Sequence, residues 1–152
     1  MNSCFFIGHA DAPEAVFAQL TQTVERLILN ENVGYFYVGG YGNFDRLAAM
    51  AVKRLKKSYP FILLMLVLPY HPSERPVPIP EGFDGTYYPE GMETVPKRYA
   101  IVRANRKMVE TVDWLIAYVW HPARNSRSIL EYAQRCEKKG QIHIMNLSGG
   151  IS

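Results

Sequence analysis

The sequence has few of the features that mark secreted, membrane-spanning or nucleic-acid-binding proteins. Its two cysteines, Cys4 and Cys136, are too few for a disulfide framework and lack the spacing of metal ligands. The longest apolar run, residues 61–68, is far shorter than a membrane span, and the first residues carry no basic lead of a targeting signal. The net charge of +3 comes without a tract of lysine or arginine. We therefore expect a cytoplasmic protein with no metal, no cofactor, no membrane association and no preference for nucleic acid.

Length and composition favour one globular domain. The chain has 152 residues, of which 48% are hydrophobic and 20% are charged. A chain of this size buries enough apolar surface to fold without metal or disulfide support. We expect a single domain over residues 1–152.

Short apolar runs alternate with amphipathic stretches, which is typical of an α/β protein. The runs are rich in aromatic and branched residues and do not alternate cleanly, as expected of parallel strands that are covered on both faces. We predict five strands, at residues 4–7, 35–38, 61–68, 114–119 and 142–145. We predict helices at residues 13–29, 44–57, 99–112 and from Ser126 to just before Gly140.

A proline-rich segment, residues 69–97, interrupts this alternation. Seven of the ten prolines lie between Pro69 and Pro96, together with the pair Tyr87 and Tyr88. The segment is too long for an ordinary connection in a compact domain, which leaves a linker, a disordered excursion or a functional lid. We favour an ordered lid or insertion because the segment is rich in aromatic residues.

Polar and glycine-rich sequence follows three of the predicted strands, where ligands bind in open parallel sheets. The loop Gly39-Gly40-Tyr41-Gly42 precedes a helix whose first amides lack partners, so it predicts either an anion cradle or only a tight turn with an Asn43 or Asp45 cap. Asp45 would repel a phosphate unless it binds a sugar hydroxyl instead.

Histidines and basic residues offer further candidates, each with a structural alternative. His9 and His121 each follow a strand and could titrate near neutrality or serve only as hydrogen-bonded structural residues. The arginines near the third helix could form a fork for an anion or only a solvated face. The ligand-binding candidates are Gly8, His9, Gly39, Gly40, Gly42, Asn43, Phe44, Asp45, Arg98, Arg103, Asn105, Arg106, His121, Arg124, Asn125 and Ser126.

Five segments of the chain form a recognisable succession. They are Phe-Ile-Gly-His at 6–9, Tyr-Val-Gly-Gly-Tyr-Gly-Asn-Phe-Asp-Arg-Leu-Ala at 37–48, Val-Pro-Lys-Arg-Tyr-Ala-Ile at 95–101, Asn-Arg-Lys-Met-Val at 105–109 and Asp-Trp-Leu-Ile-Ala-Tyr-Val at 113–119. Together they resemble the SLOG family, in its small single-domain branch from bacteria and phages. The resemblance covers residues 4 to about 147 in the family's order. It implies a Rossmann-like three-layer sandwich with a mainly parallel five-stranded sheet and helices on both faces.

The resemblance also implies a nucleotide or nucleotide-derived ligand at the strand ends. Some relatives, the LONELY GUY phosphoribohydrolases, cleave a nucleotide N-glycosidic bond, and the DNA-processing relative binds single-stranded DNA. The sequence departs from the family after the fourth strand, where Arg124 and Asn125 replace a Gly-Gly pair. Of the hydrolase motif Pro-Gly-Gly-x-Gly-Thr-x-x-Glu only Pro122 and Glu131 remain, and they are one residue too far apart. The glycines whose backbone amides would hold a phosphate are gone. Arg124 could bind the phosphate in their place, which would give a protein that binds the nucleotide without cleaving it.

We therefore expect a protein that binds a nucleotide-like small molecule, as a sensor or a sequestering protein. One alternative is a nucleotide N-glycosidic hydrolase in which Asp45 or Glu131 acts as the base. Another is a single-stranded nucleic-acid-binding module, against which the modest charge argues. The broad apolar faces of the helices, and dimers among family members, are compatible with a homo-oligomer.

Overall fold

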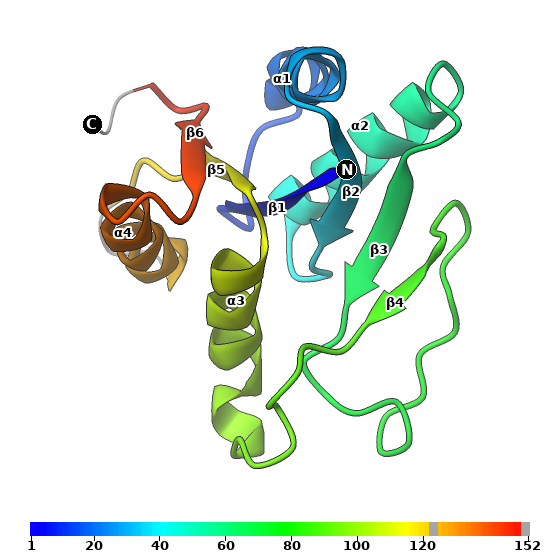
Figure 1. The fold of residues 1–152 in the computed structure, drawn as a ribbon. Helices are drawn as coiled ribbons and strands as arrows, with labels where there is room; N and C mark the ends of the chain where they lie inside the picture. Colours follow the sequence, from blue (N-terminus) through cyan, green and yellow to red (C-terminus); the bar gives the residue numbers. More distant parts are fainter. Residues whose placement is uncertain (122–124, 150–152) are drawn as a thin grey trace.

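The computed structural model describes residues 1–121 and 125–149, and for Asn125 the backbone alone. Six parallel strands form one sheet in the order β4-β3-β2-β1-β5-β6 (Figure 1). They are β1 (Asn2–Gly8), β2 (Val33–Val38), β3 (Leu63–Val67), β4 (Gly85–Tyr87), β5 (Trp114–Tyr118) and β6 (His143–Asn146). The predicted α/β class is confirmed, and the predicted count of five strands is one too low.

Four helices cover the sheet on its two faces (Figure 1). One face packs against α1 (Val16–Asn30) and α2 (Asn43–Lys56) through a core that includes Leu20 and Leu47. The other face packs against α3 (Ala100–Thr111) and α4 (Asn125–Lys138), and the short helix η1 (Lys97–Tyr99) precedes α3. Successive side chains of a strand therefore point alternately into two separate cores. Because both faces are buried, the strands are continuous apolar runs in the sequence.

The missed strand, β4, lies within the proline-rich segment. Its three residues pair with β3, and Asp84 fixes the pairing because its carboxylate accepts the Leu64 amide at 2.8 Å. The same carboxylate binds the Lys56 ammonium at 2.8 Å, which ties β4 to the end of α2. A strand of three residues flanked by prolines carries too little hydrophobic pattern to be seen in sequence.

Residues 88–95 of that segment include side chains that pack against the core on the α3 side of the sheet, whereas residues 71–79 are exposed. Met92 is 3% exposed there, and Tyr88 and Val95 contact the same core. The connection from β3 to β4, residues 68–84, contains no helix among the described residues. Whether the segment acts as a lid over a ligand stays a prediction.

The chain order creates a topological switch between β1 and β5. From β1 the strands run outward through β2, β3 and β4, and the chain then returns to the other side of β1 to form β5. In an open parallel sheet, ligands bind at the carboxyl ends of the strands beside such a switch. The residues that follow β1, β2, β3 and β5 are therefore the first place to look for a site.

Candidate functional site

The switch between β1 and β5 is occupied by the side chain of His9, which is 2% exposed. Its Nε2 accepts the backbone N–H groups of Trp120, at 3.0 Å, and His121, at 3.1 Å. Its Nδ1 lies 3.1 Å from the hydroxyl of Ser126 near the start of α4. Because Nε2 is an acceptor, Nδ1 carries the proton of the neutral ring and donates it to Ser126.

This arrangement favours the structural interpretation of His9. A base that activated Ser126 would need a free lone pair on Nδ1, and this tautomer has none. The amides of Trp120 and His121, which could otherwise have held an anion, are instead bound to the imidazole. His9 thus joins the loop after β1 to the loop after β5 and positions the latter.

The loop after β1 also covers the start of α2. The amide of Asn43 donates to the carbonyl of Ala10 at 2.9 Å, and the Asn43 side chain donates to the carbonyl of Ala12. Gly42, with φ of +155°, has a backbone conformation that only glycine adopts readily, and a Cβ there would lie 2.6 Å from the Ala10 Cα. One of the helix amides predicted to bind an anion is therefore already paired.

Gly8 and Phe44 meet where β1 ends and α2 begins. A Cβ on Gly8 would lie 2.4 Å from the Phe44 ring, so the glycine is needed for this close approach. The Phe44 ring is fully buried and stacks on Tyr118, with centroids 6.1 Å apart. Both residues were predicted to bind ligand, and the structure gives each of them a packing contact.

Asp45 folds back over the glycine loop. Its Oδ2 accepts the Tyr41 amide at 2.9 Å and would lie 3.2 Å from a Cβ on Gly39. Burial raises the pKa of Asp45 from 3.8 to about 6, and the hydrogen bond from the Tyr41 amide offsets this in part. The loop therefore holds an anion already, and that anion is the protein's own carboxylate.

No lysine or arginine in the described parts of the chain forms an ion pair with Asp45. The nearest arginine in sequence, Arg46, donates to Asn43 at 2.8 Å and pairs with Glu14. An unpaired, partly buried carboxylate at a strand end is an uncommon feature, and it marks Asp45 as a candidate functional group.

Tyr70 and Arg75 lie close to Tyr41, the residue whose amide binds Asp45. The pKa of Tyr41 is raised by burial and by Tyr70 and held down by Arg75, so these side chains are within electrostatic range of one another. The Arg75 guanidinium lies 3.8 Å from the centre of the Tyr70 ring. We call Tyr41, Asp45, Tyr70 and Arg75 the Tyr41 surface. Sequence reasoning missed Tyr70 and Arg75, although their position just after β3 could have revealed them.

The basic residues of η1 and α3 are not on the α1/α2 face of the sheet that carries the glycine loop. Arg98 is exposed and stacks on Tyr99 at 4.9 Å, and Arg106 leans over Tyr132 of α4 at 5.0 Å. The Nε of Arg106 is buried and donates to no acceptor in the described residues. Of the remaining candidates on α3, Arg103 is exposed and Asn105 is half-buried.

The structure thus separates the predicted ligand-binding residues into two groups. The glycine loop leads into α2, which packs on one face of the sheet, whereas Arg106 belongs to α3, which packs on the other. Neither of the two cavities that the structure describes is lined by members of both groups. Arg124 and the side chain of Asn125 lie outside the described residues, and the exposed Glu131 accepts the Arg127 Nε at 3.1 Å.

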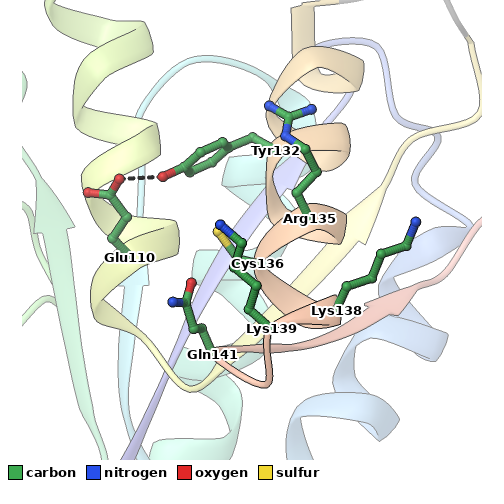
Figure 2. Close-up of a pocket in the computed structure, with 7 residues that line it drawn as sticks. All are labelled: Glu110, Tyr132, Arg135, Cys136, Lys138, Lys139 and Gln141. Carbon is green, nitrogen blue, oxygen red and sulfur yellow. Dashed lines mark hydrogen bonds between the residues drawn. The ribbon is translucent and has the colours of Figure 1, made fainter.

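The two cavities both lie away from the carboxyl ends of the strands. The larger, of about 830 Å³, is a groove between α3 and α4 close to where β5 and β6 begin (Figure 2). The smaller, of about 440 Å³, lies between the last turns of α2 and residues 81–82. Neither is where the sequence predicts the ligand.

Comparisons with known proteins leave the family of this chain open. No protein-family model and no curated protein matches the sequence. Among the described residues, no helix has the length and apolar character to cross a membrane, and no group of three or more His, Cys, Asp or Glu side chains is arranged to hold a metal.

Proposed function

We propose that the protein binds a nucleotide or a nucleotide-derived small molecule on the Tyr41 surface, at the carboxyl ends of β2 and β3. The observation that carries the proposal is the carboxylate of Asp45, which is partly buried and without an ion-pair partner among the described residues. The resemblance to the SLOG family supports the same ligand class. The switch-point topology supports the same edge of the sheet.

The Tyr41 surface offers one group for each part of a nucleotide. The Oδ1 atom of Asp45 accepts no hydrogen bond from the described residues and can accept one from a ribose hydroxyl or an exocyclic amine. Tyr41, which is 51% exposed, offers a ring for stacking of a base. The guanidinium of Arg75 forms no ion pair within the described chain and can bind a phosphate through two parallel hydrogen bonds.

This arrangement moves the phosphate away from the glycine loop. In the loop, the amides of Tyr41 and Asn43 are already bound to Asp45 and Ala10. A phosphate placed there would also meet the carboxylate of Asp45 at close range and be repelled by it. A sugar or base donor fits the same position, because it satisfies the carboxylate instead of opposing it.

Calorimetry with adenosine and AMP tests the proposal. We expect both to bind, Asp45→Asn to weaken both, and Arg75→Ala to weaken AMP by about tenfold while adenosine changes little, because only AMP carries the phosphate. Arg54→Ala is the matched control, since Arg54 also lies over an aromatic ring, that of Phe17 at 5.2 Å, but near the other end of α2. Folded protein that binds neither compound would contradict the proposal.

Hydrolysis of a nucleotide N-glycosidic bond is the second candidate, and the pKa of Asp45 favours it. A carboxyl with a pKa of about 6 is ionised at neutral pH and more basic than an ordinary aspartate, as a general base for water requires. Release of free adenine from AMP by the wild type, lost in Asp45→Asn, would establish the enzyme. Recovery of intact AMP from the complex would establish a binder.

A further inference from the structure

The groove between α3 and α4 has a different chemistry from the Tyr41 surface. Its lining comes from Glu110 on α3, from Tyr132, Arg135, Cys136 and Lys138 on α4, and from Lys139 and Gln141 just after α4. Figure 2 shows the Tyr132 hydroxyl joined to Glu110 across the gap between the helices, with Lys139 and Gln141 below them. The groove is therefore closed at one side by a fixed polar bridge and lined at the other by cations.

The cations of the groove have no carboxylate partners in the described chain. Arg135, Lys138 and Lys139 form no ion pair there, and Glu110 is engaged by Tyr132. That hydrogen bond raises the pKa of Tyr132 to about 12, so the hydroxyl keeps its proton. It therefore continues to donate a hydrogen bond to the Glu110 carboxylate. The lining thus contains three positively charged residues and one carboxylate, and of the three Lys138 extends away from Glu110 (Figure 2).

The smaller cavity is also lined by three cations, but one of them has a carboxylate partner. There, Lys56 pairs with Asp84 at 2.8 Å, whereas Lys53 lies over the Phe83 ring at 5.1 Å and Lys57 forms no ion pair in the described chain. The contrast with the groove therefore concerns the ion pair of Lys56. The groove between α3 and α4 lacks an equivalent carboxylate for Arg135 or Lys139 among the described residues.

Helix dipoles reduce the positive excess without cancelling it. The carboxyl ends of α3 and α4 each contribute roughly half a negative charge to this region. Two such ends and Glu110 together offset about two of the three positive charges. On this count about one positive charge of the lining stays uncompensated. The helix dipoles therefore do not account for all of the cations.

Arg106 adds an independent sign of missing negative charge in the same seam. The centre of the Tyr132 ring lies 5.0 Å from the guanidinium of Arg106 and 5.5 Å from that of Arg135. The buried Nε of Arg106 donates to no acceptor in the described residues. Two guanidinium groups share one ring here, and no carboxylate among the described residues pairs with either of them.

We propose that this groove is a second ligand site, separate from the Tyr41 surface, that binds a small phosphate-bearing anion. Arg135 supplies the planar fork that suits phosphate oxygens, and Lys139 supplies a mobile ammonium on the α3 side. A volume of about 830 Å³ is ample for a diphosphate group with its water. The site does not depend on the proposed function, because it shares no residue with the Tyr41 surface.

Calorimetric titration of the whole protein with inorganic pyrophosphate, at constant ionic strength, tests the proposal. We expect saturable binding that weakens at least about tenfold in the double variant Arg135→Ala/Lys139→Ala. The matched control, Lys53→Ala/Lys57→Ala, removes the same charge from the smaller cavity and should bind pyrophosphate like the wild type. Circular dichroism establishes that each variant is folded.

Three results would overturn the proposal: no binding to the wild type, equal weakening in both double variants, or weakening in Arg75→Ala. The last variant also separates the two sites, because loss of AMP binding at the Tyr41 surface leaves the pyrophosphate titration unchanged. Titration with ADP distinguishes a free diphosphate from the tail of a nucleotide. ADP binding that persists in Arg75→Ala and falls in Arg135→Ala/Lys139→Ala would assign the tail to the groove.

Cysteine alkylation locates the bound anion. Cys136 lines the groove with 6% of its surface exposed, whereas Cys4 is fully buried in the opposite core and serves as an internal control. Pyrophosphate at saturation should slow the alkylation of Cys136, read by mass spectrometry, and leave Cys4 unreacted. An unchanged rate at Cys136 would place the pyrophosphate elsewhere and contradict the proposal.

Discussion

The carboxyl ends of the strands and the groove between α3 and α4 treat their hydrogen-bond donors in opposite ways. At the strand ends, loop amides are paired with the protein's own acceptors, those of His9, Asp45 and Ala10. In the groove, Arg135 and Lys139 face no carboxylate partner in the described residues. A glycine-rich loop before a helix can therefore bind a carboxylate of the protein itself, here Asp45, instead of an anionic ligand. The positive charge without a carboxylate partner then lies elsewhere, here in the groove between α3 and α4.

This difference defines what each region can bind. The strand ends present the acceptor Asp45 and suit a ligand that donates hydrogen bonds, with one guanidinium, Arg75, at their margin. The groove presents donors and suits an anion. The predictions below test whether the contacts at the strand ends are as internally paired as this comparison requires.

Removal of the His9 imidazole should have the largest effect on stability. We expect His9→Ala to lower the free energy of unfolding by about 3 kcal/mol, because the amides of Trp120 and His121 lose their acceptor and a buried ring is lost. Urea denaturation measures the change. The control is His71→Ala, since His71 is exposed and binds only Ser73 and the Tyr88 ring edge in the described structure. A loss of less than about 1 kcal/mol in His9→Ala would show that water replaces the imidazole.

A side chain at the start of α2 should have the next largest effect. We expect Gly42→Ala to cost about 2 kcal/mol, because its φ of +155° is strained for alanine and the new Cβ would meet the backbone of Ala10. Gly40→Ala is the matched control, since the nearest atom to its Cβ lies at an ordinary 3.8 Å. Equal unfolding free energies for the two variants would mean that the Ala10 loop is not pinned to α2.

The pH dependence of stability should show a smaller effect from Asp45. Its pKa is raised from 3.8 to about 6 in the folded protein, so the folded state binds the proton more tightly than the unfolded chain. This contribution is fully present below about pH 3.8 and is lost as the pH rises through 6. Between pH 4 and pH 7 the wild type should therefore lose about 1–2 kcal/mol more stability than Asp45→Asn.

The Asp45→Asn substitution isolates the charge, because an amide cannot ionise but its oxygen still accepts the Tyr41 N–H. Unfolding in urea at pH 4, 5, 6 and 7 gives the profiles of the wild type and the variant. Parallel profiles would show that Asp45 ionises normally in the folded protein. If Asp45→Asn is also more stable than the wild type at pH 7 and binds adenosine less well, stability at this position is exchanged for binding.

The strands and helices that build the core were predictable from the sequence, and the internal contacts of the loops were not. Period and composition identified α2 at residues 44–57, close to Asn43–Lys56, because Leu47 and its neighbours repeat at helical spacing. The strand β4 escaped prediction because three residues among prolines carry no periodic signal. Its place in the sheet depends on Asp84, which binds residues far away in the sequence.

The candidate site was predictable in location and only partly in content. The glycine loop and Asp45 follow β2, so their place at the strand ends could be inferred from topology. That Asp45 turns back onto the Tyr41 amide could not, because a side-chain rotamer is set by packing that the sequence does not display. The arginines of α3 were expected beside the glycine loop, but chain order alone does not say which face of the sheet a helix covers.

Chemical-shift mapping with AMP on ¹⁵N-labelled protein shows whether the ligand binds at the Tyr41 surface. We expect the amides of Tyr41, Asp45, Tyr70 and Arg75 to shift together and to saturate with a single binding constant. The amides of Gly8 and Phe44, which serve packing, should shift less. Saturation by AMP with no change at residues 41–45 and 70–75 would contradict the assignment of the ligand to this edge of the sheet.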